Sequence, residues 1–266
     1  MLKKRVITAT LLIPLLTVMV WFDQPLPWLT LFVAFWGIMA VLEFFRIVAA
    51  SKVVPLTSLG LIWALLFILS PHFDHGQLSA PLLTSFLIVS LIWLVLRRHR
   101  QEAFSAWVWT LAGVLYVGWF LSHIVAMRGL ESGREWVLLA LFVTFASDSA
   151  AYLIGRRWGK HRLSSTISPH KTWEGAVAGV VGAIILSPLL TWLLDLPLDF
   201  AQAVLLGLVI SIVGQFGDLV ESVFKRNMDT KDSGETIPGH GGFLDRMDSV
   251  LFAGVTVYYF VVWFVQ

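Results

Sequence analysis

The chain of 266 residues contains no cysteine, and only 14% of its residues are charged. The lack of cysteine excludes a disulfide framework, a thiolate metal site and a cysteine nucleophile. Any metal ion must therefore be held by carboxylate, histidine, backbone or substrate atoms. The scarcity of charge, together with 58% hydrophobic residues, is far from the composition of a soluble domain and predicts an integral membrane protein.

Nine apolar segments are candidates to cross a hydrocarbon layer roughly 30 Å thick, which takes about 20 residues. We place them at about 6–22, 27–45, 56–70, 81–96, 103–126, 136–154, 174–194, 201–217 and 249–265. The predicted fold is an all-α polytopic integral membrane protein with about nine transmembrane helices. About five spans form an N-terminal region, residues 1–130, and about four form a C-terminal region, residues 131–266.

Basic residues are concentrated on one side of this arrangement. If the amino terminus is inside, the inside segments hold 17 of the 19 Lys and Arg residues, and only Arg128 and Arg134 fall outside. Cytoplasmic loops are enriched in Lys and Arg. The bias therefore predicts a cytoplasmic amino terminus and cytoplasmic loops at residues 155–173 and 218–248.

The most polar segment lies between the last two predicted spans, at residues 222–248, and reads SVFKRNMDTKDSGETIPGHGGFLDRMD. Charge close to lipid is costly and is usually kept for function. If the span before this segment stays helical past Asp218, side chains at steps of three and four residues share one face. They are Asp218, then Glu221 or Ser222, and then Lys225.

Two further carboxylates end the segment. Asp245 and Asp248 are three residues apart, so they are predicted to share one face of the helix that enters the last span. Two carboxylate pairs would then meet at the cytoplasmic ends of adjacent helices. Without cysteine, an all-oxygen site of this kind suits Mg²⁺, which takes one or two carboxylates plus substrate phosphates.

The same segment supplies positive charge and glycine. Lys and Arg pair with phosphate oxygens, and the glycines of PGHGG allow positive φ and close approach of the backbone to a ligand. His240 could donate a hydrogen bond to a phosphate or transfer a proton. These features favour a phosphate and metal site over a solvated loop whose charges pair with one another. The cations are Lys225, Arg226, Lys231 and Arg246.

A second polar stretch occupies residues 147–175. Asp148 lies within a predicted span, where an acid is a functional candidate, although it could instead be the structural partner of a buried polar group. Lys171 stands in SPHKTWEG, just before the next span, and is a candidate for binding substrate phosphate.

Two other patterns have structural interpretations. Glu43 and Arg46 are three residues apart at a predicted span end, which indicates a pair that reaches towards water. Gly175 and Gly179 form a GxxxG, with Ala178 and Gly182 as a second small pair, and this spacing predicts close helix packing.

The run from Ser222 to Asp248 can be written S-x-x-K-R-x4-K-D-x-G-x2-I-P-x-H-G-G-x2-D-R-x-D. It resembles the signature of the phosphatidate cytidylyltransferases, also called CDP-diacylglycerol synthases. The earlier stretch, with Asp148, Tyr152 and SPHKTWEG, is also similar to that family, except that His170 stands where a Lys is expected. The first 130 residues match only as hydrophobic spans.

The resemblance implies the reaction of CTP with phosphatidate to give CDP-diacylglycerol and pyrophosphate. It also implies dependence on Mg²⁺, with or without a second cation. The active site would lie at the cytoplasmic face of the C-terminal region, in a bacterial inner membrane. The substrates and membrane lipid are the expected partners, nucleic acid is not, and a homo-oligomer such as a dimer stays open.

The catalytic residues would be Asp218, Lys225, Asp245 and Asp248, with Asp218, Asp245 and Asp248 also as metal ligands. Substrate would be bound by Asp148, Lys171, Ser222, Arg226, Lys231, Asp232, His240 and Arg246.

Two alternatives stay open, a kinase and a transporter, and a third is excluded by its missing motif. A CTP-dependent polyprenol kinase would release CDP instead of pyrophosphate. A CDP-alcohol phosphotransferase should contain a D-G-x2-A-R run followed by paired Asp residues, and the sequence has no such run. An ion-coupled transporter could use Asp148 and Asp218, but transporters often have two related halves, whereas the polar residues here are concentrated in the C-terminal half.

Overall fold

A computed structural model describes residues 13–22, 27–74, 78–97, 100–230, 232–234, 236 and 241–265. The chain divides into two compact units. The first unit combines Met1–Gly129 with Asn227–Arg246, and the second combines Leu130–Arg226 with Met247–Gln266. We refer to residues 227–246 as the signature loop, which therefore groups with the N-terminal helices.

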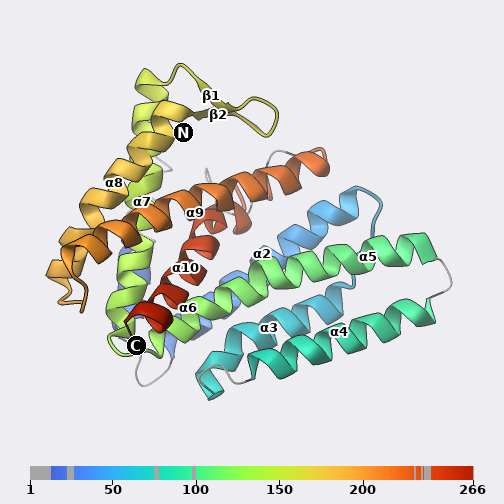
Figure 1. The fold of residues 1–266 in the computed structure, drawn as a ribbon. Coiled ribbons are helices and arrows are strands. Elements are labelled where there is room, and N and C mark those ends of the chain that lie inside the picture. The colour runs from blue at the N-terminus through green and yellow to red at the C-terminus, as the bar shows by residue number, and fades with distance from the viewer. Residues whose placement is uncertain are drawn as a thin grey trace. The chain divides into compact units, whose positions relative to one another are not determined.

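The first unit is built from apolar helices (Figure 1). Helix α3 packs against α2, α4, the π-helix η1 and α6. Gly118 of η1 allows this packing, because a Cβ at that position would lie 2.7 Å from the Cα of Ala64 on α3. The elements are α2 (Trp28–Ala50), α3 (Thr57–Asp74), α4 (Ser79–Leu96), α5 (Arg100–Gly113), η1 (Val114–Trp119), α6 (Phe120–Arg128) and the 3₁₀ turn η2 (Leu244–Arg246).

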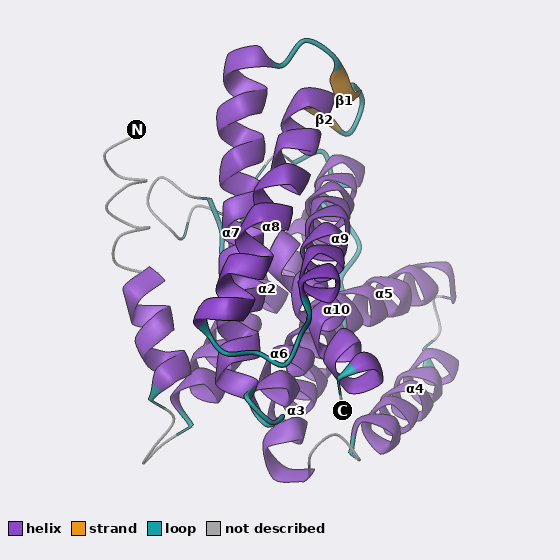
Figure 2. Ribbon diagram, turned by 60° about the vertical axis from the view of Figure 1, so that its left-hand side comes forward, coloured by secondary structure: helices purple, strands orange, loops and turns teal. Residues whose placement is uncertain are grey.

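The second unit contains four long helices and a short hairpin. Helices α7 and α8 run side by side, and the hairpin lies beyond their ends (Figures 1 and 2). The elements are α7 (Gly133–Trp158), β1 (Arg162–Ser164), β2 (Ser168–Thr172), α8 (Trp173–Leu193), α9 (Phe200–Asn227) and α10 (Asp248–Phe264).

Close packing of α7 and α8 depends on glycine, as the GxxxG spacing predicted. A Cβ at Gly175 would lie 2.7 Å from the carbonyl oxygen of Ala151, and one at Gly179 would lie 3.0 Å from that of Ser147. A larger side chain would therefore meet backbone atoms of the neighbouring helix. The prediction of close helix packing at this GxxxG is confirmed.

The hairpin departs from the all-helical prediction. Strands β1 and β2 pair antiparallel, with Arg162 opposite Thr172 and Ser164 opposite Ser168. Thr172 then ends β2 and caps α8, because its hydroxyl accepts a hydrogen bond from the Gly175 N–H at 3.2 Å. Two strands of three and five residues are too short to give a clear alternating pattern in the sequence.

The protein is mostly helical and polytopic. Among the described residues, six helical segments are long and apolar enough to cross a membrane, namely 28–50, 79–96, 102–128, 133–158, 173–193 and 200–227. Two apolar helices, 57–73 and 248–264, are shorter. Of the predicted span at 6–22, residues 6–12 lie outside the described part of the chain, and residues 13–21 are helical. The number nine therefore stays a prediction.

Candidate active site

Helix α9 provides the first carboxylates of the candidate site. It continues to Asn227, so the condition for a shared face, a helix that extends past Asp218, is met. Asp218, Glu221 and Lys225 share one face, and Lys225 Nζ donates to Glu221 Oε2 at 2.7 Å. The Glu221 side chain is 1% exposed and that of Lys225 is 14% exposed. This ion pair is therefore almost fully removed from solvent.

Helix α10 supplies a third carboxylate, Asp248, which is its first residue. Gly217 of α9 lies directly against it, because a Cβ at Gly217 would clash with the Asp248 carbonyl oxygen. One oxygen from each of Asp218, Glu221 and Asp248 lies within 4.8 Å of the other two. We call these three residues the carboxylate cluster.

The carboxylate cluster has the chemistry of a site for a hard cation. Three ionised carboxylates at this separation repel one another unless protons or a cation offset their charge. All three donors are oxygen atoms, which are the ligands that Mg²⁺ prefers. The donor set therefore fits the predicted divalent cation, with Glu221 added to Asp218 and Asp248.

A lysine from the hairpin also reaches the cluster. Lys171 on β2 places Nζ 2.7 Å from Asp218 Oδ2. Their side chains are 24% and 35% exposed, more than those of the pair on α9, although the Lys171 Nζ atom itself is buried. Sequence analysis predicted Lys171 and Asp218 for one site, and the structure brings them into direct contact.

Ser249 connects Asp248 to a further acid of the site, Asp148. Its N–H donates to Asp248 Oδ1 at 2.8 Å, and its hydroxyl donates to Asp148 Oδ1 at 3.5 Å. Asp148 of α7 therefore lies beside the start of α10, as a member of the same site. Ser249 could not be recognised from the sequence, because it is one small polar residue next to Asp248.

Arg226, near the end of α9, holds the hairpin turn. Its Nε donates to the carbonyl oxygen of Ile167 at 3.3 Å. Ser222, one residue after Glu221, is half-buried on the same helix. Their predicted roles in substrate binding stay predictions.

Asp245 differs from its predicted placement. Sequence analysis placed Asp245 and Asp248 on one face of a single helix, which is wrong because α10 begins only at Asp248 and Asp245 lies in the 3₁₀ turn η2. In the first unit, Asp245 Oδ2 accepts hydrogen bonds from the N–H groups of Ser233 and Gly242, at 3.0 and 2.8 Å. Its role as a metal ligand stays a prediction.

The other predicted substrate-binding residues of the segment belong to the signature loop. The backbone oxygen of Asp232 accepts a hydrogen bond from the Thr230 hydroxyl at 3.1 Å, and Arg246 is exposed. Lys231 and His240 lie outside the described residues. The roles predicted for these four residues stay predictions.

Glu43 was interpreted wrongly from the sequence. It does not reach towards water, because it is 2% exposed and its carboxylate accepts hydrogen bonds from the signature loop. A local pattern could not reveal this contact, since its partners lie 190 to 201 residues further along the chain.

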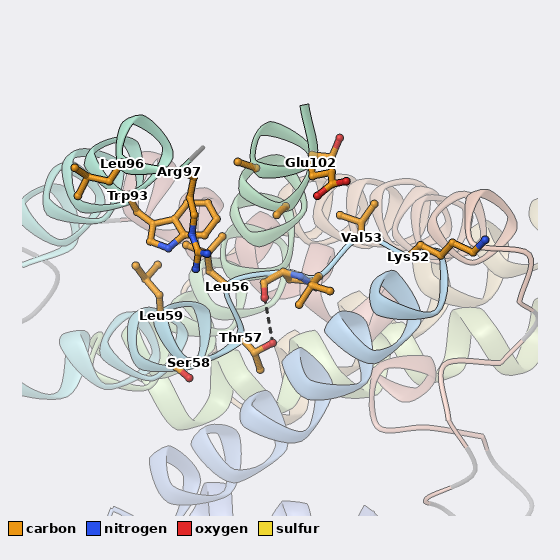
Figure 3. Close-up of a pocket in the computed structure, with 15 residues that line it drawn as sticks. Lys52, Val53, Leu56, Thr57, Ser58, Leu59, Trp93, Leu96, Arg97 and Glu102 are labelled. Atoms are coloured by element: carbon orange, nitrogen blue, oxygen red, sulfur yellow. Dashed lines mark hydrogen bonds between the residues drawn. The ribbon is translucent and has the colours of Figure 1, made fainter. Parts of the chain in front are cut away.

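A separate pocket of about 910 Å³ lies in the first unit, between the segment before α3 and the facing ends of α4 and α5 (Figure 3). Arg97 stacks over the Trp93 ring at 4.8 Å, and Glu102 stands on the neighbouring helix (Figure 3). No residue predicted for the active site lines this pocket. The candidate site therefore stays with the carboxylate cluster.

The fold and the site define a polytopic membrane protein with a carboxylate cluster suited to a divalent cation and flanked by lysines. Residues 3–264 match the cytidylyltransferase family, and the chain belongs to that family. The match covers both units.

Relatives within the family are named for one reaction. The chain is 33% identical to the phosphatidate cytidylyltransferase of Bacillus subtilis (strain 168) over 233 residues, which is 86% of each chain. It is 38% identical to that of Staphylococcus haemolyticus over 192 residues, covering 71% of this chain and 73% of the relative. It is also 38% identical to phosphatidate cytidylyltransferase 5, chloroplastic, of Arabidopsis thaliana, covering 76% of this chain and 55% of the relative.

Proposed function

We propose that this protein is a phosphatidate cytidylyltransferase, which converts CTP and phosphatidate into CDP-diacylglycerol and pyrophosphate. The main observation is that the carboxylates of Asp218, Glu221 and Asp248 converge in a member of the cytidylyltransferase family. Lys171 forms an ion pair with Asp218, and Lys225 forms one with Glu221. The names of relatives that cover most of the chain agree with this reaction.

In the proposed reaction, a phosphate oxygen of phosphatidate attacks the α-phosphorus of CTP. The new P–O bond forms as the bond between that phosphorus and the oxygen bridging to the β-phosphorus breaks, and pyrophosphate leaves with the bonding electrons. The two substrates supply every atom, so no covalent intermediate with the protein is needed. The protein then acts mainly by positioning the substrates and offsetting charge.

Asp218, Glu221 and Asp248 are the residues that would hold Mg²⁺, directly or through water. When bound there, Mg²⁺ would supply positive charge to the phosphate oxygens. Lys171 orients the Asp218 carboxylate, and Lys225 offsets the charge of Glu221 where solvent is excluded. Asp148 is oriented through Ser249, which also fixes Asp248.

We also propose that the amino terminus and the carboxylate cluster face the cytoplasm of a bacterial inner membrane. The distribution of Lys and Arg between the predicted inside and outside segments supports this orientation. The bacterial relatives support the source. Phosphatidate would reach the site from the bilayer, and CTP from the cytoplasm.

The test is pyrophosphate release by the purified, detergent-solubilised chain given CTP, phosphatidate and Mg²⁺. Asp248→Asn removes one charge from the carboxylate cluster and should abolish most of the release. Asp195→Asn is the matched control, because Asp195 is exposed and its φ of 53° suits asparagine as well as aspartate. It should behave like the wild type.

The products distinguish the alternatives. Release that requires both substrates and the metal, with CDP-diacylglycerol as the lipid product, supports the proposal. Formation of CDP instead of pyrophosphate would identify a kinase. Folded wild-type protein that forms neither product would contradict the proposed function.

A further inference from the structure

Glu43 is a buried charged residue outside the carboxylate cluster. It lies on α2 and is 2% exposed. Its carboxylate accepts hydrogen bonds from Ser233 Oγ at 3.1 Å, Thr236 Oγ1 at 2.9 Å and Leu244 N at 3.0 Å. A buried carboxylate is stable only when hydrogen bonds or opposite charges compensate for lost water. All three of these donors come from the signature loop.

Two glycines of the signature loop make room for this carboxylate. A Cβ at Gly234 would lie 2.8 Å from Glu43 Oε1. A Cβ at Gly242 would clash with Glu43 Oε2 and with Ser233 Oγ. Gly241 is different, because its φ of +79° requires a backbone conformation that favours glycine. Gly234 and Gly242 therefore leave space for the Glu43 carboxylate, a role that does not depend on a ligand.

Helix α2 holds the loop at a second point. Trp36 lies seven residues before Glu43, on the same face of the helix. Its Nε1–H donates to the carbonyl oxygen of Phe243 at 3.0 Å. The two rings also meet edge to face, with centroids 4.7 Å apart.

Asp245 forms hydrogen bonds within the signature loop. Its Oδ2 accepts from the N–H groups of Ser233 and Gly242, and its own N–H donates to Ser233 Oγ at 3.4 Å. Ser233 therefore contacts both acids, through its hydroxyl to Glu43 and through its N–H to Asp245. Loss of the Glu43 carboxylate would remove the hydrogen bonds that hold the loop to α2 at Ser233, Thr236 and Leu244.

We propose that Glu43 is a positioning residue, which holds the signature loop in its working conformation through these buried hydrogen bonds. Glu43 does not need to touch substrate in this role. The loop contains Lys231, His240 and Arg246, which are predicted to bind substrate, so its conformation should affect substrate affinity. The kinetic consequence rests on the proposed function, whereas the structural consequence rests on the hydrogen bonds alone.

The test compares Glu43→Gln with the wild type in the purified full chain. Glutamine has nearly the same shape, but its NH₂ group cannot accept and must face at least one of the three donors. We expect kcat/KM to fall by about tenfold or more, mainly through a higher KM for CTP. Glu102→Gln is the matched control, because Glu102 is exposed and belongs to the same unit.

Limited trypsin digestion supplies a readout that does not depend on activity. Cleavage after Lys231 and Arg246 reports opening of the signature loop, and cleavage within residues 155–173 is the internal reference. In Glu43→Gln, loop cleavage should become faster while the reference sites are unchanged. Thr236→Val, which removes a single donor, should show a smaller change in the same direction.

The outcomes separate this inference from the proposed function. Loop cleavage at the wild-type rate in Glu43→Gln would overturn the inference. Equal acceleration at both sets of sites would also overturn it, because it would mean general destabilisation. If the wild type released no pyrophosphate but Glu43→Gln still opened the loop selectively, the proposed function would fail and the positioning role would stand.

Discussion

Replacing Lys225 by methionine tests how the buried carboxylates are held. Methionine keeps much of the side-chain bulk and removes the charge. Because Glu221 is 1% exposed and Lys225 is 14% exposed, the variant leaves Glu221 buried without this lysine. Removing one partner of a buried ion pair costs about 3–5 kcal/mol. At about 2–4 °C per kcal/mol, the melting temperature should fall by roughly 10 °C.

Lys171→Met is the matched comparison, because it removes the other lysine. The Asp218 side chain that is left behind is 35% exposed, so water can replace part of the lost interaction. A cost of about 1 kcal/mol or less is expected for a solvated pair. The melting temperature of Lys171→Met should therefore change by only a few degrees.

Unfolding can be followed by intrinsic fluorescence, since the chain contains 13 tryptophans. Glu221→Gln combined with Lys225→Met should recover part of the lost stability, because the buried negative charge that Lys225 offset is then also removed. Added Mg²⁺ should raise the melting temperature of Lys225→Met more than that of the wild type, if it binds Glu221. Equal melting temperatures of Lys225→Met and Lys171→Met would contradict a buried Glu221–Lys225 ion pair. A double variant no more stable than Lys225→Met would contradict it as well.

Two further predictions concern helix packing and the metal. Gly175→Ala should lower the melting temperature, because its Cβ would lie 2.7 Å from the Ala151 carbonyl oxygen. Gly182→Ala should be tolerated better, because its Cβ would lie 3.1 Å from the Ala150 methyl group and 3.6 Å from the Ala146 carbonyl oxygen. Chelation with EDTA should stop pyrophosphate release. Asp218→Asn should raise the Mg²⁺ concentration for half-maximal activity by about tenfold or more.

Much of the fold could be predicted because long apolar segments in lipid must satisfy their backbone hydrogen bonds as helices. The predicted spans from 27–45 onwards each correspond to a described apolar helical segment. The π-helix η1 and the hairpin after α7 were missed. Both depend on packing and turn geometry, which hydrophobicity alone does not report. In η1, for example, Gly118 fits against Ala64 of a different helix.

The candidate site was predictable where the signal was local. Helical periodicity put Asp218 and Glu221 on one face, but it left Glu221 and Ser222 as equal alternatives. The structure selects Glu221, because it joins Asp218 and Asp248. Glu43 could not be found in this way, since an acid near a span end looks the same whether it faces water or a loop from a distant part of the chain.

The charges of the second unit predict that the substrates need positive charge beyond what balances the carboxylate cluster. Four acids of the site, Asp148, Asp218, Glu221 and Asp248, are accompanied by two lysines, Lys171 and Lys225. A single divalent cation would offset the remaining two negative charges and leave nothing to offset the phosphates of CTP and phosphatidate. We therefore expect further cations to contribute to substrate affinity, and Arg226, at the end of α9 in the same unit, is a candidate. Asp218→Asn should mainly change the Mg²⁺ dependence, whereas variants that release the loop from Glu43 should mainly change the KM for CTP.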